Sequence, residues 1–202
     1  MNIAIIGTGS VGGSIGTQWA KCNHKVVYGV REINERVKQR LKESDDRAEA
    51  LPISNALTKC GVVLLAIPGK AVDDFLAAHG DALNGKLIID ATNRTGSDAF
   101  HDLNAIQVVA PEAQVVRAFN TLGWEMFADP IVGGEQASLF FCGPLESRAT
   151  AETLIADVGL HPVYVGGIEQ IETVDSLAKL WFSLAFGQKM GRRVALRLIT
   201  ES

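Results

Sequence analysis

The stretch Ile3-Ala4-Ile5-Ile6-Gly7-Thr8-Gly9-Ser10-Val11-Gly12 decides the fold. Its first four residues form an uninterrupted apolar run, which is typical of a strand buried on both faces in a parallel sheet. The residues from Gly7 to Gly12 fit the pattern GxGxxG, and a helix of residues 10–21 is expected to follow. A second strand is expected at Lys25–Val30. The sequence therefore predicts a βαβ unit of the dinucleotide-binding kind.

Each glycine of the pattern has a physical role in such a unit. Gly7 permits the tight turn, Gly9 lets the backbone approach a pyrophosphate, and Gly12 lets the helix pack closely on the strand. The amide N–H groups of the turn and the positive end of the helix then hold the diphosphate. The alternative is a glycine-rich turn that binds no ligand.

The end of the second predicted strand indicates which dinucleotide is bound. Sites specific for NAD usually place an acidic residue there, whereas this strand ends at Val30-Arg31. A guanidinium at this point can hold a 2′-phosphate through two hydrogen bonds, which favours NADP(H) over NAD. Glu32 is expected to begin the next helix, over residues 32–43, and to point elsewhere. Arg36 and Lys38 are further candidates for binding this phosphate; alternatively, they belong to a solvated helix face.

Strands and helices alternate over most of the chain. This pattern predicts an α/β protein with an NAD(P)-binding Rossmann fold, in which a doubly wound, mainly parallel sheet is followed by a C-terminal helical extension. The expected domains are a Rossmann domain over residues 1–167 and an extension over residues 168–202, in which residues 168–184 form a long helix. Further strands are expected at Val62–Ile67, Lys86–Asp90, Gln114–Phe119, Ser138–Cys142 and His161–Val165, and further helices at residues 70–79 and 146–157.

Three of these strands end in residues suited to a ligand. In open α/β sheets, ligands bind beyond the carboxyl ends of the strands. The candidates are Ala66, Ile67 and Pro68 after one strand, Asn93 after the next, and Phe119 and Asn120 after a third. Alternatively, the asparagines form turns and Phe119 belongs to the core.

Composition narrows the class of protein. The 202 residues carry a net charge of −4, which argues against general affinity for nucleic acid or an anionic membrane surface. The three cysteines lack CxxC spacing and the four histidines lack ligand spacing, so neither a disulfide framework nor a metal site is expected. The N-terminus shows no signal peptide and no segment is long and apolar enough to span a bilayer, so a cytoplasmic protein is expected.

Several motifs resemble one known family, the NADPH-dependent reductases of the deazaflavin coenzyme F420. The matching pieces are Ile5–Gly12, Tyr28-Gly29-Val30-Arg31, Leu65–Pro68, Val116–Leu122 and Cys142-Gly143. The chain is also similar to the cytoplasmic oxidoreductase domains of membrane ferric reductases. The family often has a serine that helps to bind the 2′-phosphate where this chain has Val30, so Arg31 lacks that additional ligand here.

The resemblance implies a homodimeric enzyme that passes hydride between NADPH and a deazaflavin or flavin ring. It implies that Thr8, Gly9, Ser10 and Val11 hold the pyrophosphate, that Arg31 holds the 2′-phosphate, and that the loops at Ile67 and Asn93 flank the nicotinamide ribose. The apolar C-terminal helix is expected to pack on a second subunit, or else to cover its own sheet.

The sequence contains no catalytic constellation of the short-chain dehydrogenase kind, no nucleophile elbow and no metal cluster. This absence suits hydride exchange between two ring carriers, in which the cofactors supply the chemistry. Two alternatives stay open. One is a small imine or carbonyl reductase, although such enzymes usually carry a large helical dimerisation domain. The other is a non-catalytic NADP-binding sensor or scaffold.

Overall fold

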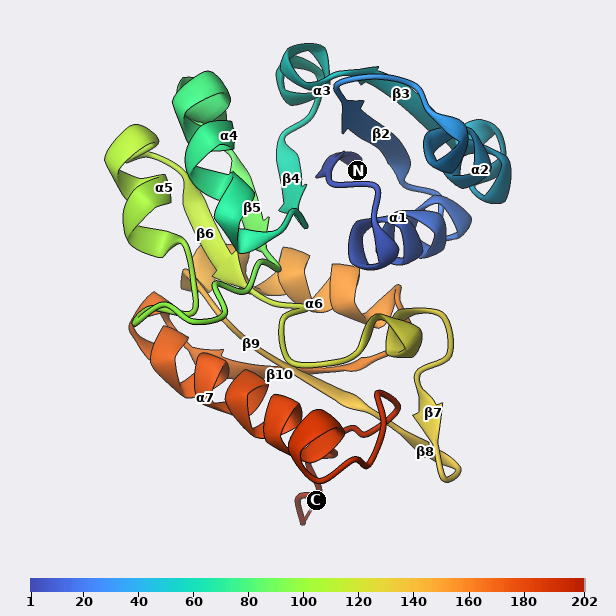
Figure 1. Ribbon diagram of the computed structural model, residues 1–202, viewed down its shortest axis with the longest axis vertical. Helices are drawn as coiled ribbons and strands as arrows, with labels where there is room; N and C mark the ends of the chain where they lie inside the picture. The colour runs from blue at the N-terminus through green and yellow to red at the C-terminus, as the bar shows by residue number, and fades with distance from the viewer. Residues whose placement is uncertain (202) are drawn as a thin grey trace. The chain divides into compact units, whose positions relative to one another are not determined.

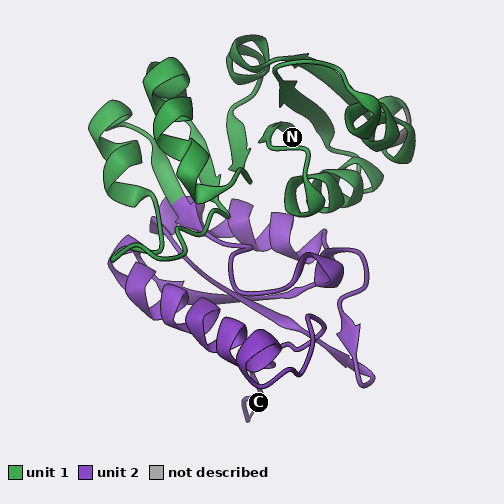
Figure 2. Cartoon of the chain, viewed as in Figure 1, with its two compact units in different colours: residues 1–115 green, residues 116–202 purple. Residues whose placement is uncertain are grey.

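The computed structural model describes residues 1–201, with the side chain of Asp45 excepted. The chain divides into two compact units, one of residues 1–115 and one that begins at Val116 (Figure 2). The boundary expected at residue 168 falls inside the second unit. The two units are described separately.

The first unit is built on five parallel strands in the order β5-β4-β1-β2-β3. β1 lies in the middle, where Ile3 is opposite Val26 of β2 on one side and Val62 of β4 on the other. Ile3, Ala4 and Ile5 are fully buried, as the apolar run predicted. The strands are β1 (Asn2–Ile6), β2 (Lys25–Val30), β3 (Ala48–Pro52), β4 (Val62–Leu65) and β5 (Leu87–Asp90).

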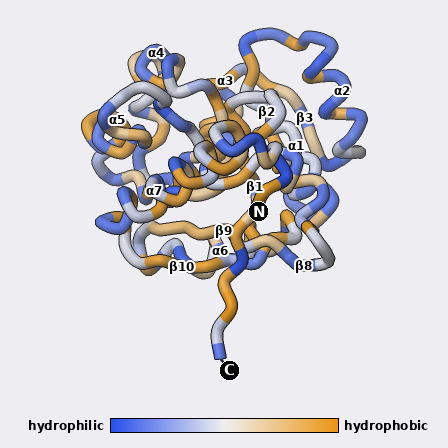
Figure 3. Tube along the Cα trace, turned by 60° about the horizontal axis from the view of Figure 1, so that its bottom comes forward, coloured by the Kyte–Doolittle hydropathy of each residue, from blue (hydrophilic) through white to orange (hydrophobic). Residues whose placement is uncertain are grey.

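Helices connect these strands and confirm the doubly wound pattern. α1 packs against α2, and α4 packs against α5 (Figure 1). Figure 3 shows hydrophobic residues along β1 and hydrophilic residues along α2, as expected for a central strand and an outer helix. The helices are α1 (Ser10–Lys21), α2 (Glu35–Glu43), α3 (Ile53–Lys59), α4 (Val72–His79) and α5 (Leu103–Val109).

The expected start of α2 at residue 32 is wrong. The side chain of Asn34 accepts a hydrogen bond from the backbone N–H of Val37 at 3.1 Å, so Asn34 caps the helix and α2 begins at Glu35. Glu32 therefore lies in the loop after β2 rather than on a helix.

Other differences are small or concern short elements. The strand expected at Val62–Ile67 ends at Leu65, and the helix expected from residue 70 begins at Val72 after a 3₁₀ turn over Gly69–Ala71. The sequence did not predict β3, α3 or α5, which have five to seven residues each.

The second unit contains a mixed sheet of three strands in the order β10-β9-β6. β9 and β10 are parallel, whereas β6 meets β9 antiparallel, with Arg117 opposite Cys142. The division between the units falls within β6. The strands are β6 (Gln114–Arg117), β9 (Ser138–Cys142) and β10 (His161–Gly166), and a short hairpin is formed by β7 (Ile131–Val132) and β8 (Glu135–Gln136).

Two helices accompany this sheet, α6 (Arg148–Ala156) and α7 (Ile171–Phe182). The long helix expected over residues 168–184 is a 3₁₀ turn, then α7, then a π-helical turn over Ser183–Gly187. The described residues after Gly187 contain no helix. Within the described part of the chain, no helix has the length and apolar character needed to cross a membrane.

Candidate functional site

A cavity of about 640 Å³ opens in the first unit beyond the carboxyl ends of β1 and β2. The GxGxxG turn forms one wall and the loop after β2 forms another. Its lining includes seven of the predicted site residues: Gly7, Thr8, Gly9, Arg31, Ala66, Ile67 and Pro68.

A second cavity, of about 290 Å³, continues from the first. The two share the residues Gly9, Ala66, Ile67 and Pro68, so they form one groove that passes over the glycine turn. The second cavity adds three more predicted site residues: Ser10, Val11 and Asn93. The chain thus brings ten of its predicted site residues into one continuous groove, which we call the cofactor groove.

The geometry of Gly7 and Gly12 shows why side chains are absent there. Gly7 has φ +112°, and a Cβ atom on it would lie 2.4 Å from the carbonyl oxygen of Ala66. A Cβ atom on Gly12 would lie 2.0 Å from the carbonyl oxygen of Gly7. Gly12 does not line the groove; it permits the close packing that holds the turn in place.

Gly9 differs from both. A Cβ atom built on Gly9 would meet nothing within 4 Å. The fold therefore does not need a glycine at this position. Because Gly9 lines both parts of the groove, the space above its backbone is open to a bound molecule.

The mouth of the groove carries charges of both signs. Arg31, Glu32 and Arg36 all line the first cavity. Lys38 does not line it, and its ammonium group lies 2.6 Å from the carboxylate of Glu35. The sequence expected Glu32 to point elsewhere, whereas the structure places it beside Arg31 in the same wall. The groove therefore presents both guanidinium groups, which suit a phosphate, and a carboxylate, which suits ribose hydroxyls.

Phe119 and Asn120 belong to the second unit. Phe119 is buried and has φ +64°, a left-handed conformation that is uncommon for a bulky residue. The strand that was expected to continue to residue 119 ends at Arg117. The amide Nδ2 of Asn120 donates to Oδ1 of Asp175 at 2.9 Å. Oδ1 of Asp175 also accepts from Nε of Arg117 at 2.8 Å.

This buried cluster was not predicted from the sequence. Arg117 and Asp175 have no exposed surface. The sequence did contain a signal for a buried charge. Asp175 lies on the apolar face of α7, four residues after Ile171 and three before Ala178.

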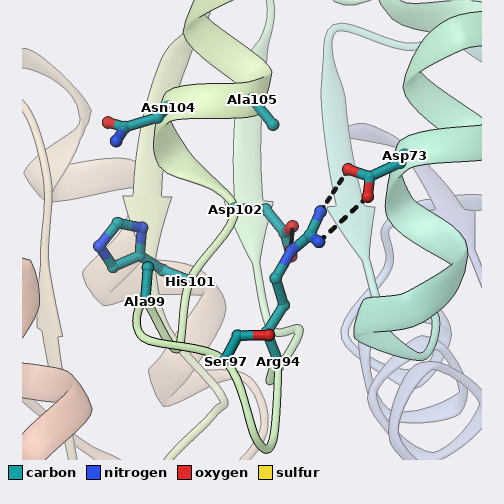
Figure 4. A pocket seen from close by; sticks show the side chains of 8 residues that line it. All are labelled: Asp73, Arg94, Ser97, Ala99, His101, Asp102, Asn104 and Ala105. Atoms are coloured by element: carbon teal, nitrogen blue, oxygen red, sulfur yellow. Dashed lines mark hydrogen bonds and ion pairs between the residues drawn. The ribbon is translucent and has the colours of Figure 1, made fainter.

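A second missed cluster surrounds Arg94 in the first unit. Its guanidinium binds Asp73 of α4 through two hydrogen bonds and also contacts Asp102 (Figure 4). These three residues line a separate cavity of about 280 Å³ with His101. Among the described residues, no group of His, Cys, Asp and Glu side chains could hold a metal ion.

Comparison with known proteins agrees with this geometry. Residues 2–94 match the family of coenzyme F420-dependent NADP oxidoreductases, and the resemblance predicted from the motifs is confirmed over this part of the chain. A candidate F420-dependent NADP-reductase from Arthrobacter sp. FB24 is 23% identical, with a TM-score of 0.84 over 99% of this chain and 100% of that chain. That likeness confirms the predicted fold class.

Two further proteins share only part of their length with this chain. A reductive aminase from Aspergillus terreus, solved with NADPH4, cyclohexanone and allyl amine, is 20% identical with a TM-score of 0.69; the match covers 93% of this chain and 62% of that one. A glycerol-3-phosphate dehydrogenase [NAD(P)+] from Pseudomonas savastanoi pv. phaseolicola is 26% identical over 125 residues, or 56% of this chain. The match spans 37% of the length of that relative.

Proposed function

We propose that this chain is an NADP(H)-binding oxidoreductase that transfers hydride between NADPH and a deazaflavin (F420) or flavin-type acceptor. The observation that carries the proposal is the cofactor groove, in which an open glycine turn and Arg31 line the same continuous space. The match of residues 2–94 to the F420-dependent NADP oxidoreductases supports both the cofactor and the acceptor class.

Each part of the groove has a role in this proposal. The backbone N–H groups of Thr8, Gly9, Ser10 and Val11, at the start of α1, bind the pyrophosphate, because the N-terminus of a helix favours anions. Arg31 binds the 2′-phosphate. The segment Ala66-Ile67-Pro68 and Asn93 flank the nicotinamide ribose in the second cavity. Phe119 and Asn120 follow β6 in the second unit and stay cofactor-binding candidates on the strand-end rule alone.

The bound dinucleotide would supply the hydride, and the protein would supply binding, orientation and exclusion of water. Reduction of a deazaflavin or flavin ring takes up one hydride and one proton, so oxidation of each NADPH consumes one proton from the medium. No side chain needs to act as a nucleophile.

Turnover assays test the proposal directly. The purified chain should oxidise NADPH with F420, FMN or FAD, followed at the absorbance of NADPH, and ferric chelates serve as a further acceptor. Binding of NADPH without turnover of any acceptor would favour the alternative of an NADP-binding sensor or scaffold. Failure to bind NADPH would refute both.

A small imine or carbonyl reductase is the second candidate function. The fold likeness to the reductive aminase favours it. This chain, however, spans only 62% of that protein. Oxidation of NADPH with a cyclic imine or a ketone plus an amine, at a rate above that with F420 and flavins, would establish this alternative.

We further propose that the protein is a cytoplasmic homodimer. The C-terminal part of the second unit exposes the apolar side chains of Leu180, Phe186 and Met190, by 43%, 50% and 62%. Sedimentation should give a dimer, and Phe186→Glu should shift it toward the monomer. Val108→Glu is the matched control, because Val108 is an exposed apolar residue of α5, in the first unit. A monomer at micromolar concentration would contradict the proposal.

A further inference from the structure

Two aspartates and a threonine form a buried polar cluster at the end of β5. Asp90 has no exposed surface, and Asp102 and Thr92 are 2% and 1% exposed. The hydroxyl oxygen of Thr92 lies 2.5 Å from Oδ1 of Asp90 and 2.6 Å from Oδ2 of Asp102. One hydroxyl group therefore lies at hydrogen-bond distance from two carboxyl groups.

Counting protons shows that the two aspartates cannot both be ionised in this arrangement. A threonine hydroxyl carries one hydrogen, and an ionised carboxylate only accepts. Both oxygen–oxygen distances are those of a hydrogen bond, and each such bond needs its own proton. One proton comes from Thr92, so the second must come from an aspartate.

The neighbouring groups indicate that Asp102 is the donor. The backbone N–H groups of Thr92 and Asp102 donate to the two oxygens of Asp90, at 2.9 and 3.4 Å, so both oxygens of Asp90 already act as acceptors. Burial raises the pKa of Asp102, and the nearby negative charge of Asp90 raises it further, against the lowering effects of Thr92 and Arg94.

Charged side chains also lie beside this cluster. Arg94 contacts Asp102 and is held on its other side by Asp73 of α4, and His101 lines the same cavity (Figure 4). Helix α5, which begins directly after Asp102, carries no titratable side chain. With one proton on the pair, the single negative charge left on the two buried aspartates faces the guanidinium of Arg94, which also binds Asp73.

We infer that Asp90 and Asp102 share one buried proton, and that protonated Asp102 is a positioning residue that holds Thr92 and Asn93 in the wall of the cofactor groove. Thr92 and Asn93 both line the second cavity of that groove. When the proton leaves, two negative carboxylates face one hydroxyl that can donate to only one of them. The turn that carries Asn93 is then no longer held from both sides.

If the shared proton holds Thr92 and Asn93 in place, the affinity for NADPH depends on pH. Because the proton belongs to the binding-competent arrangement, affinity for NADPH decreases as the pH rises through the pKa of the pair. The decrease is at most about tenfold per pH unit, because one proton is linked to binding. This step rests on the proposed function, whereas the shared proton itself does not.

Infrared spectroscopy tests the shared proton without any ligand. The wild-type protein near neutral pH should show the carbonyl band of a buried carboxylic acid, shifted in D₂O. Asp102→Asn should remove this band, and so should Asp90→Asn. A spectrum in which neither substitution removes such a band would overturn the inference, whether or not the protein binds NADPH.

Binding measurements test the positioning role. An asparagine at position 102 can donate to Thr92 and accept from Arg94 at every pH, so Asp102→Asn should bind NADPH within about twofold of wild type and lose the pH dependence. Asp102→Leu should bind more weakly throughout. Asp73→Asn is the control, because Asp73 contacts Arg94 from an exposed position and its substitution should leave the pH dependence in place. Retention of the wild-type pH profile by Asp102→Asn would refute the role.

Discussion

Arg117 and Asp175, which lie 58 residues apart, form an ion pair with no exposed surface, in which Nε of Arg117 is 2.8 Å from Oδ1 of Asp175. The pair joins the first strand of the second unit to α7. Asn120 donates to the same carboxylate oxygen. Arg117 and Asn120 flank Phe119, whose left-handed backbone needs support from its surroundings.

Removal of one partner of this pair should be costly. Asp175→Ala should lower the free energy of unfolding by about 3–5 kcal/mol, because the guanidinium of Arg117 would remain buried without its counter-charge. Urea denaturation measures the change. Thr173→Ala, at an exposed position of the same helix, should change stability by no more than about 0.5 kcal/mol. Equal effects of the two substitutions would contradict this account.

Substitution of Gly9 should separate binding from folding. Gly9→Ala should leave the melting temperature unchanged, because a Cβ atom there meets nothing within 4 Å. It should weaken NADPH binding strongly, because the methyl group would occupy the space of the pyrophosphate. Gly61→Ala is the control, since its Cβ atom would also lie in open space but away from the groove. Unchanged affinity for NADPH after Gly9→Ala would remove the glycine turn from the site.

Arg31 and Glu32 should have opposite effects on cofactor preference. Arg31→Ala should weaken NADPH binding by ~1.5–3 kcal/mol more than NADH binding, because a charge-assisted contact to the 2′-phosphate is lost. Glu32→Gln should shift the preference toward NADPH, because it removes a negative charge from the same wall. Titration of each variant with both cofactors gives the two ratios. Equal losses for both cofactors after Arg31→Ala would show that Arg31 does not bind the phosphate.

The three cysteines should differ in reactivity. Burial raises the pKa of Cys142 to about 12 and also raises that of Cys60, so both remain neutral thiols at pH 8. Cys22 is exposed. A thiol reagent should therefore modify one cysteine quickly in the native protein and all three after denaturation. Rapid modification of two or three in the native protein would contradict the burial described above.

The N-terminal βαβ unit could be predicted almost to the residue. The strand Asn2–Ile6, the helix Ser10–Lys21 and the strand Lys25–Val30 each carry a local signal, namely an apolar run or a glycine that permits a turn. The glycine turn of the groove followed from the GxGxxG pattern, and Arg31 and Asn93 followed from their places at the ends of strands.

The features that the sequence did not reveal depend on contacts between distant residues. Asp102 follows an irregular segment, and nothing local indicates that its backbone N–H donates to Asp90. The position of Glu32 depended on whether Asn34 or an earlier residue would cap α2, and capping is decided by one hydrogen bond. The burial of Asp175 depended on Arg117, which the sequence places on a separate strand.

Contacts within the second unit join residues that are far apart in the order of synthesis. The backbone oxygen of Leu196 accepts from the N–H of Ser138 at 2.9 Å, so a segment near residue 196 lies along the start of β9. A nascent chain that has reached residue 115 already contains all five parallel strands of the first unit. The nascent chain must grow past residue 175 before Arg117 can pair with Asp175. It must grow past residue 196 before Ser138 of β9 can form its hydrogen bond to Leu196. The first unit can therefore form on the ribosome, whereas the second is completed only after residue 196 has emerged.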